Sequence, residues 1–281
     1  MKEIKTLYII GNGFDLHHDI PSSYYDYMHW LKCIYPELAE EIERTFEGAN
    51  QDSWWSDFEC HLAKVDCAYD ISILIYPDFE VDGIQLKGTN SPDRLAALYK
   101  AIQKTFTMWV SDLNDSLPAV HPDLPLDSDA AFLTFNYTDT LQEVYHIPDS
   151  QILHIHGNVR RGEEVIIGHN STGDYYPEKQ YEMVDFKNAP FDVAKEITAF
   201  RKPTTKIIET HRKWFESLKE VEQITVCGFS FSDVDKPYVQ EILRSVSKGS
   251  KWIIYIHSLW DFMHMTDKCE ELLIDYDFMD W

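Results

Sequence analysis

The sequence predicts an α/β protein in which a mostly parallel β-sheet is covered by helices on both faces. Two observations predict this fold class. Short runs rich in Ile, Val and Phe lack the strict alternation of half-exposed strands, as expected for parallel strands buried on both faces. Longer segments with apolar residues at helical spacing lie between these runs, in the alternation typical of α/β folds.

The apolar runs predict the strands. Each run is short, as buried strands are, and polar or turn-forming residues bound it. In chain order, the expected strands are Thr6–Ile10, Ala130–Phe135, Ile152–Ile155, Val165–Ile167, Gln223–Cys227 and Trp252–His257.

Cap residues and apolar spacing predict the helices. The first helix begins with a Ser-type cap and carries Tyr24, Tyr27, Met28 and Leu31 at helical spacing. Pro237 suits the first turn of a later helix. The expected helices are Ser22–Ile34, Pro36–Phe46, Trp54–Asp66, Arg94–Leu117, Pro237–Val246 and Asp261–Leu273.

The domain organisation follows from the length and the order of these elements. A chain of 281 residues can form one large domain or two small ones. The simplest arrangement is a single α/β domain over residues 1–281, with a helical insertion at about 37–128 and a second elaboration at about 170–220. Polar connections that contain Gly or Pro lie at 83–92 and 118–129.

The composition excludes several classes of protein. A formal net charge of -23 argues against a broad nucleic-acid surface, which needs clustered Lys and Arg. No apolar run is long enough to span a membrane, and residues 1–5 lack a signal-peptide h-region. The five cysteines are widely spaced, with no CxxC pair. We therefore expect a reduced, cytoplasmic protein with no membrane partner. The 16 tyrosines and 8 tryptophans allow homo-oligomers, without locating an interface.

The turn after the first strand resembles half of a nucleotide site. Gly11 and Gly13 have no Cβ, so the backbone can turn sharply and approach a ligand closely. The helix expected at residues 21–23 has free N–H groups that favour phosphate. A dinucleotide fingerprint needs a third glycine where Leu16 stands, and the Gly-Lys-Ser/Thr of a P-loop is absent.

Two later strand ends carry polar side chains. Asn136 follows the second strand and His156 the third, 20 residues further along, which is the length of a crossover to an adjacent parallel strand. Both side chains should therefore lie at the carboxyl edge of the sheet, where open α/β sheets build their sites. Gly228 and Ser230 form another strand–glycine–serine turn.

These segments resemble known families. The stretches Gly11–Tyr24, Leu133–Leu141, Leu153–Asn158 and Val226–Asp235 are similar to NAD-binding segments of sirtuins. The chain more closely resembles the AbiH family of bacterial abortive-infection proteins. The blocks that carry this resemblance are Gly11–Leu16, Pro21–Tyr24, Trp55–Glu59, Phe135–Thr138, His154–Gly157 and Gly228–Ser230. The resemblance implies phage defence by host shutdown, on a Rossmann-like, sirtuin-like core; the phage trigger is not readable from the sequence.

The sirtuin-like kinship implies NAD, or a related dinucleotide, as the ligand. It assigns Asn136 and His156 to catalysis, and dinucleotide contacts to Gly11, Asn12, Gly13, Phe14, Asp15, Gly228 and Ser230. The structural zinc of protein deacetylases has no CxxC ligands here, and Thr138 replaces an aspartate expected on the nicotinamide side. Deacylation is therefore disfavoured. We expect hydrolysis of NAD at the nicotinamide bond, with His156 as general base and Asn136 holding the ribose or the attacking water.

Simpler interpretations stay open beside this one. His156 can cap a strand end and Asn136 can satisfy a turn. Asp15 can bond the loop backbone or face the cofactor, and Ser230 can cap a turn. We expect Asp233 and Asp235 to be helix caps. Glu59 is either a buried carboxylate or part of a solvated helix face.

Two other functions also stay open. A metal-dependent hydrolase could use His154 and His156, with His169 or Asp139 as third ligand. A core histidine is the simpler interpretation of His154, and we expect no metal. The third possibility is a non-catalytic nucleotide sensor that acts on a partner.

Overall fold

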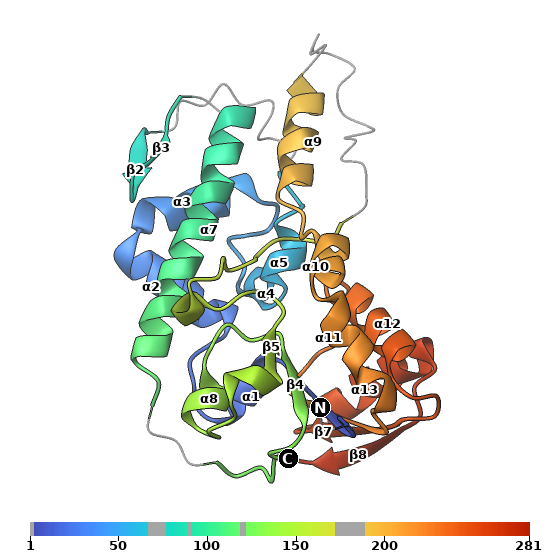
Figure 1. The fold of residues 1–281 in the computed structure, drawn as a ribbon. Coiled ribbons are helices and arrows are strands. Elements are labelled where there is room, and N and C mark those ends of the chain that lie inside the picture. Colours follow the sequence, from blue (N-terminus) through green and yellow to red (C-terminus); the bar gives the residue numbers. More distant parts are fainter. Residues whose placement is uncertain (1–2, 67–76, 89–90, 119–121, 172–188) are drawn as a thin grey trace. The chain divides into compact units, whose positions relative to one another are not determined.

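The computed structural model describes residues 3–66, 77–88, 91–118, 122–171 and 189–281 (Figure 1). The chain forms two compact units, each described here by itself. The sheet unit comprises Met1–Ser22, Val110–Val165 and Pro203–Trp281. The helical unit comprises Ser23–Trp109 and Ile166–Lys202.

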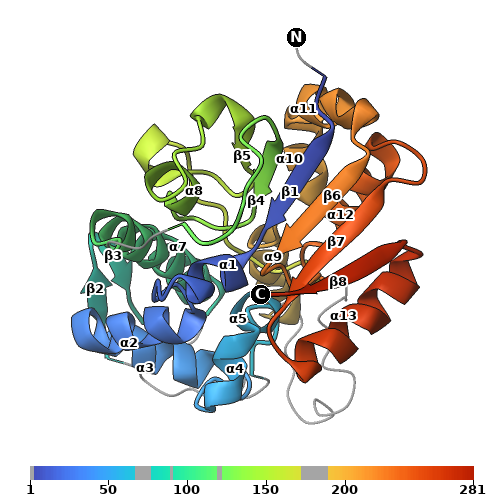
Figure 2. The same cartoon turned by 90° about the horizontal axis from the view of Figure 1, so that it is seen from below.

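A six-stranded sheet forms the centre of the described sheet unit, and each neighbouring pair of strands is parallel. Figure 2 shows its strands in the order β5-β4-β1-β6-β7-β8. The strands are β1 (Thr6–Ile10), β4 (Ala131–Thr134), β5 (Ile152–His154), β6 (Gln223–Cys227), β7 (Lys251–Ile256) and β8 (Tyr276–Asp280). The predicted parallel α/β fold is confirmed.

The strand order reverses between β1 and β6. From β1 the chain builds outward through β4 to β5, then returns to the other side of β1 and builds outward through β6, β7 and β8. This is the order of doubly wound dinucleotide folds, in which ligands bind at the reversal, outside the carboxyl ends of the strands. At that edge Ile10 pairs with both Thr134 and Cys227, so the ends of β4, β1 and β6 are level.

Both faces of the sheet are covered at its centre. Consecutive residues of a strand point to opposite faces, and Leu7, Tyr8, Ile9 and Ile10 are all buried. On one face Tyr8 stacks on Phe132 with ring centroids 5.0 Å apart. The helices of this unit are α1 (Asn12–His17), α8 (Thr140–Glu143), α10 (Thr204–Thr210), α11 (Arg212–Glu216), α12 (Lys236–Ser245) and α13 (Leu259–Leu272), with 3-10 turns at Asp149–Gln151, Val159–Arg161 and Ser217–Glu220.

The helical unit has an aromatic core around Tyr27. The tyrosine is fully buried, its ring contacts those of Trp55, Phe58 and Phe106, and its hydroxyl lies 2.8 Å from that of Thr105. The elements are α2 (Tyr24–Ile34), α3 (Pro36–Thr45), α4 (Asp52–Ser56), α5 (Phe58–His61), the hairpin of β2 (Phe79–Val81) and β3 (Ile84–Leu86), and α9 (Ala189–Ala199). Helix α7 (Pro92–Asp115) belongs to this unit up to residue 109 and to the sheet unit beyond it.

Several strands and helices differ from the prediction. Residues 165–167 are buried in part but form no strand. The predicted helix 54–66 is two short helices, α4 and α5, because the backbone of Asp57 leaves the helical conformation. Strand β8 and the β2–β3 hairpin were not predicted. A helix also begins directly after Gly11, as α1, rather than first near residue 22.

The helix at residues 24–34 has a satisfied N-terminus. Ser23 and Asp26 form a capping box, in which the Ser23 N–H donates to the Asp26 carboxylate at 2.9 Å. Because a carboxylate already occupies this helix end, the predicted phosphate role of residues 21–23 loses its basis. In the part of the chain that the structure describes, no helix is long and apolar enough to cross a membrane.

Candidate functional site

The glycine loops after β1 and β6 pack backbone to backbone at the strand-order reversal. Gly11 N donates to Cys227 O at 3.0 Å, and Gly13 N donates to Gly228 O at 2.9 Å. A Cβ on Gly13 would lie 2.7 Å from the Cα of Gly228. Gly228 has φ +64°, and a Cβ there would lie 2.1 Å from Phe14 N. A Cβ on Gly11 would likewise lie 2.5 Å from the Cα of Phe229, so close packing accounts for glycine at all three positions and brings the predicted loops together.

The other predicted dinucleotide contacts differ in exposure. Asn12 is exposed and accepts a hydrogen bond from Ser22 Oγ at 2.6 Å. Ser230 is exposed, and its carbonyl lies 3.1 Å from His264 Nε2. Phe14 is fully buried in the core, so its ring presents no face to a ligand. Of these three residues, Asn12 and Ser230 remain candidates for contact.

Asp15 connects the turn after β1 to the loop after β4. Its carboxylate is buried and accepts hydrogen bonds from the hydroxyls of Thr138 and Thr140, the latter at 2.7 Å. Burial raises the pKa of this carboxyl group, while the bonds from Thr138, Thr140 and Asn136 oppose the shift. The sequence offered a backbone bond or a cofactor contact for Asp15; its carboxylate instead binds side chains of the neighbouring loop.

The amide of Asn136 is held from the same side. Its Nδ2 donates to Gly11 O at 3.0 Å, and it also bonds the Asp15 carboxylate. The amide group is thereby held against the end of β1, and its Oδ1 is an acceptor by chemistry. The backbone N–H of Asn136 donates to Thr134 Oγ1 at 3.1 Å. The loop after β4 is therefore fixed to the end of β1.

His156 follows β5 in an aromatic and acidic setting. Its side chain is nearly fully buried, and its Nε2 lies 3.7 Å from Asp235 Oδ1. The rings of Phe135, Tyr137 and Tyr238 lie 5.6, 6.0 and 5.6 Å from the imidazole. Asn136 and His156 thus follow adjacent parallel strands at one edge of the sheet, as predicted.

The position of Asp235 corrects the prediction that it caps a helix. It precedes α12, but its side chain makes no capping bond. It faces His156 instead, and its Oδ2 accepts from Ser232 Oγ at 3.0 Å. No sequence pattern indicates this pair, since the contact depends on the path of the loop after β6. Asp233, also predicted as a cap, is exposed and forms an ion pair with Lys268 at 3.2 Å.

His154 is a satisfied core histidine. Its Nδ1 donates to Asn136 O at 3.3 Å, and its Nε2 accepts from the amides of Gln142 and Asn158 at 3.0 and 3.2 Å. Burial lowers its pKa, so the ring is neutral. Both nitrogens are used, which leaves none for a metal ion.

The remaining residues of the metal alternative are also engaged. His169 lies in the helical unit, 2.8 Å from the carbonyl of Ile197. Asp139 accepts from Asn158 at 2.6 Å. Across the described ranges, no three His, Cys, Asp or Glu side chains form a group that could hold a metal. Nothing in this geometry supports the metal-dependent alternative.

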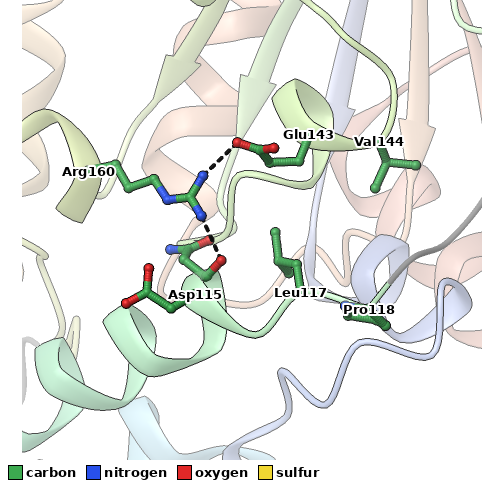
Figure 3. A pocket seen from close by; sticks show the side chains of 7 residues that line it. Asp115, Leu117, Pro118, Glu143, Val144 and Arg160 are labelled. Atoms are coloured by element: carbon green, nitrogen blue, oxygen red, sulfur yellow. Dashed lines mark hydrogen bonds and ion pairs between the residues drawn. The ribbon is translucent and has the colours of Figure 1, made fainter.

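A polar pocket of about 310 Å³ lies beside this network (Figure 3). Arg160 forms one wall, donating to Glu143 at 2.6 Å and to the carbonyl of Asn114 at 2.7 Å. Arg160 Nε also pairs with Asp139 at 3.2 Å. The lining residues are Asn114, Asp115, Leu117, Pro118, Glu143, Val144 and Arg160. None of the predicted site residues lines this pocket.

Glu59 belongs to the helical unit. Its carboxylate pairs with the buried ammonium of Lys202 at 2.8 Å and lies 3.3 Å from the N–H of Gly168. Of the two interpretations of Glu59, the structure favours the partly buried carboxylate.

Comparison with known proteins identifies the family. The family model described as bacteriophage abortive infection AbiH matches residues 7–256, a span that holds the four strand ends described above. No curated protein matches the chain. The resemblance to AbiH drawn from the sequence blocks is confirmed, whereas kinship with sirtuins stays a prediction. The chain therefore belongs to the AbiH family of bacteriophage abortive infection proteins.

Proposed function

We propose that this AbiH protein acts in the cytoplasm by hydrolysing NAD at its nicotinamide glycosidic bond. One observation carries the proposal. The ends of β5, β4, β1 and β6 bring His156, Asn136 and the two glycine loops to the carboxyl edge, at the strand-order reversal where doubly wound sheets bind dinucleotides. The proposal gives the abortive-infection role a chemical basis, since loss of NAD stops host metabolism.

The reaction needs little from the protein beyond positioning and a base. The nicotinamide nitrogen is cationic in NAD, so it leaves with the bonding electron pair as a neutral molecule and needs no acid. Water adds to the anomeric carbon of the ribose and gives its proton to His156, because histidine is the side chain that most often serves as a general base. The products are nicotinamide and ADP-ribose.

Asn136 would orient the reacting groups. Its Nδ2 is bound to Gly11 O, and its Oδ1 would accept a hydrogen bond from the water or from a ribose hydroxyl. The exposed side chains of Asn12 and Ser230 would bond the rest of the dinucleotide. Gly11, Gly13 and Gly228 would set the shape of the two loops, because their close packing leaves no open space for the ligand at those positions.

The test is incubation of the purified protein with NAD while free nicotinamide is followed. We expect His156→Ala and Asn136→Ala each to lower turnover by about 10²–10⁴-fold, the usual contribution of a positioned base or orienting group. His29→Ala, an exposed histidine on α2, is the matched control and should turn over NAD as the wild type does.

Three results would count against the proposal. Unchanged NAD cleavage in both site variants would refute the residue assignment. Binding of NAD without turnover would favour a nucleotide sensor. Stoichiometric zinc or manganese in the purified protein, with cleavage lost on chelation, would favour a metal-dependent hydrolase.

A further inference from the structure

The loop between β6 and α12 presents a carboxylate to His156. The two side chains are 14% and 3% exposed, so the pair at 3.7 Å is largely shielded from water. Opposite charges interact more strongly in such surroundings than at the surface. The contact therefore has more influence on the imidazole than an exposed ion pair of the same length.

A strained turn leads the chain to this position. Phe231 has φ +53°, a left-handed conformation that a bulky residue rarely adopts. Its ring is buried and packs against those of Phe229 and Trp252, with centroids 5.1 and 6.3 Å apart, and this packing holds the turn. The bond from Ser232 Oγ to Asp235 Oδ2 then fixes the carboxylate. Strain kept in this way is common where a structure must aim a side chain.

Among the residues that the structure describes, ionisable side chains that contact His156 come from the loop after β4, from the loop before α12 and from α12 itself. They are the Asp235 carboxylate before α12 and the phenols of Tyr137, after β4, and Tyr238, on α12. Of the three, only a carboxylate carries charge near neutral pH. The aromatic rings restrict the plane of the imidazole, and Asp235 faces one of its nitrogens.

We propose that Asp235 is a positioning residue for His156. Its carboxylate orients the imidazole and stabilises the imidazolium that forms when His156 takes the proton from water. This inference rests on the proposed function for its role in turnover, although the coupling between the two side chains can be measured without turnover.

The experiment compares Asp235→Asn with Asp233→Asn, an exposed acid two residues away, in the full chain. Histidine-selective NMR titration reports the pKa of each imidazole, and His156→Gln identifies the signal of His156. We expect Asp235→Asn to lower the pKa of His156 by about 1–3 units, the usual effect of losing an adjacent opposite charge. Asp233→Asn should leave that pKa unchanged.

Kinetics give the second measurement. In Asp235→Asn we expect the acid limb of the pH profile for NAD cleavage to move to lower pH by a similar amount. We also expect kcat to fall about tenfold or more while KM for NAD changes little, as for an interaction made mainly in the transition state. Asp235→Glu, which restores the charge, should recover part of the loss.

The two proposals fail separately. A shifted pKa of His156 without any NAD cleavage would uphold the coupling and refute the hydrolase. NAD cleavage with the same pKa and pH profile in Asp235→Asn would refute the positioning role and leave the hydrolase standing. If Asp235→Asn does not fold, Ser232→Ala, which removes the bond to the carboxylate, must lower the same pKa; an unchanged value would overturn the inference.

Discussion

Replacing Asp15 by alanine should destabilise the sheet unit by about 2–4 kcal/mol. The hydroxyls of Thr138 and Thr140 and the amide of Asn136 lose a common acceptor, and each unsatisfied buried donor costs about 1–3 kcal/mol. Two effects reduce the sum. The Thr140 hydroxyl lies 3.2 Å from that of Thr138 and can bond to it, and the variant no longer buries a carboxylate.

Asp15→Asn separates shape from charge in the same network. The amide keeps the volume of the side chain, and the threonine hydroxyls can turn to accept from it, so we expect a loss of about 1 kcal/mol. Asp19→Asn is the matched control: Asp19 is exposed, and asparagine tolerates its φ of +56°, so the change should stay within about 0.5 kcal/mol. Urea unfolding at pH 7 measures all three. An Asp15→Ala variant as stable as the control would show that this network does not hold the two loops together.

Two further predictions concern the same edge of the sheet. Gly228→Ala places a Cβ 2.1 Å from Phe14 N and should lower the free energy of unfolding in urea by about 3 kcal/mol or more. Gly249→Ala is the control: this glycine has φ +80° and nothing within 4 Å of the position that a Cβ would take, so the loss should be about 1 kcal/mol. Equal losses in the two variants would refute the close-packing argument. Burial lowers the pKa of His154 below its ordinary value of 6.5, so the folded state binds its proton less readily than the unfolded chain. The contribution of His154 to the free energy of unfolding should therefore be fully present above pH 6.5 and fall as the pH drops toward the folded-state pKa. His154→Gln should remove this part of the dependence of the unfolding free energy on pH. His29→Gln, at an exposed position, should leave it unchanged.

Local pattern predicts the central strands well. Thr6–Ile10 and Gln223–Cys227 form strands with the predicted bounds, because each is an apolar run that ends at a glycine required by close packing. Strand β8 was missed because Asp277 and Asp280 interrupt its apolar residues. Such a pattern suits an edge strand, which pairs with β7 alone and exposes part of each face.

The site is only partly predictable for a related reason. Strand order and crossover length place Asn136 and His156 at one edge, so the sequence can pair them. The Asp235–His156 contact depends on the left-handed turn at Phe231, and phenylalanine gives no local signal for that conformation. Likewise, the apolar spacing around Trp54 and Phe58 continues across the break between α4 and α5, so periodicity predicts one helix where there are two.

Residues from different AbiH sequence blocks form hydrogen bonds with one another, so several of them have a structural role. Asp15 binds Thr138, Asn136 binds Gly11, and His154 binds the carbonyl of Asn136. These bonds fix the ends of β1, β4 and β5 before any ligand arrives, as a preorganised site requires. Their residues therefore have structural reasons to be where they are. Asn136 and His156, which follow the adjacent strands β4 and β5, are the two residues to which we assign chemistry in the proposed reaction. A variant that leaves those bonds intact but abolishes NAD cleavage is the most direct evidence for such an assignment.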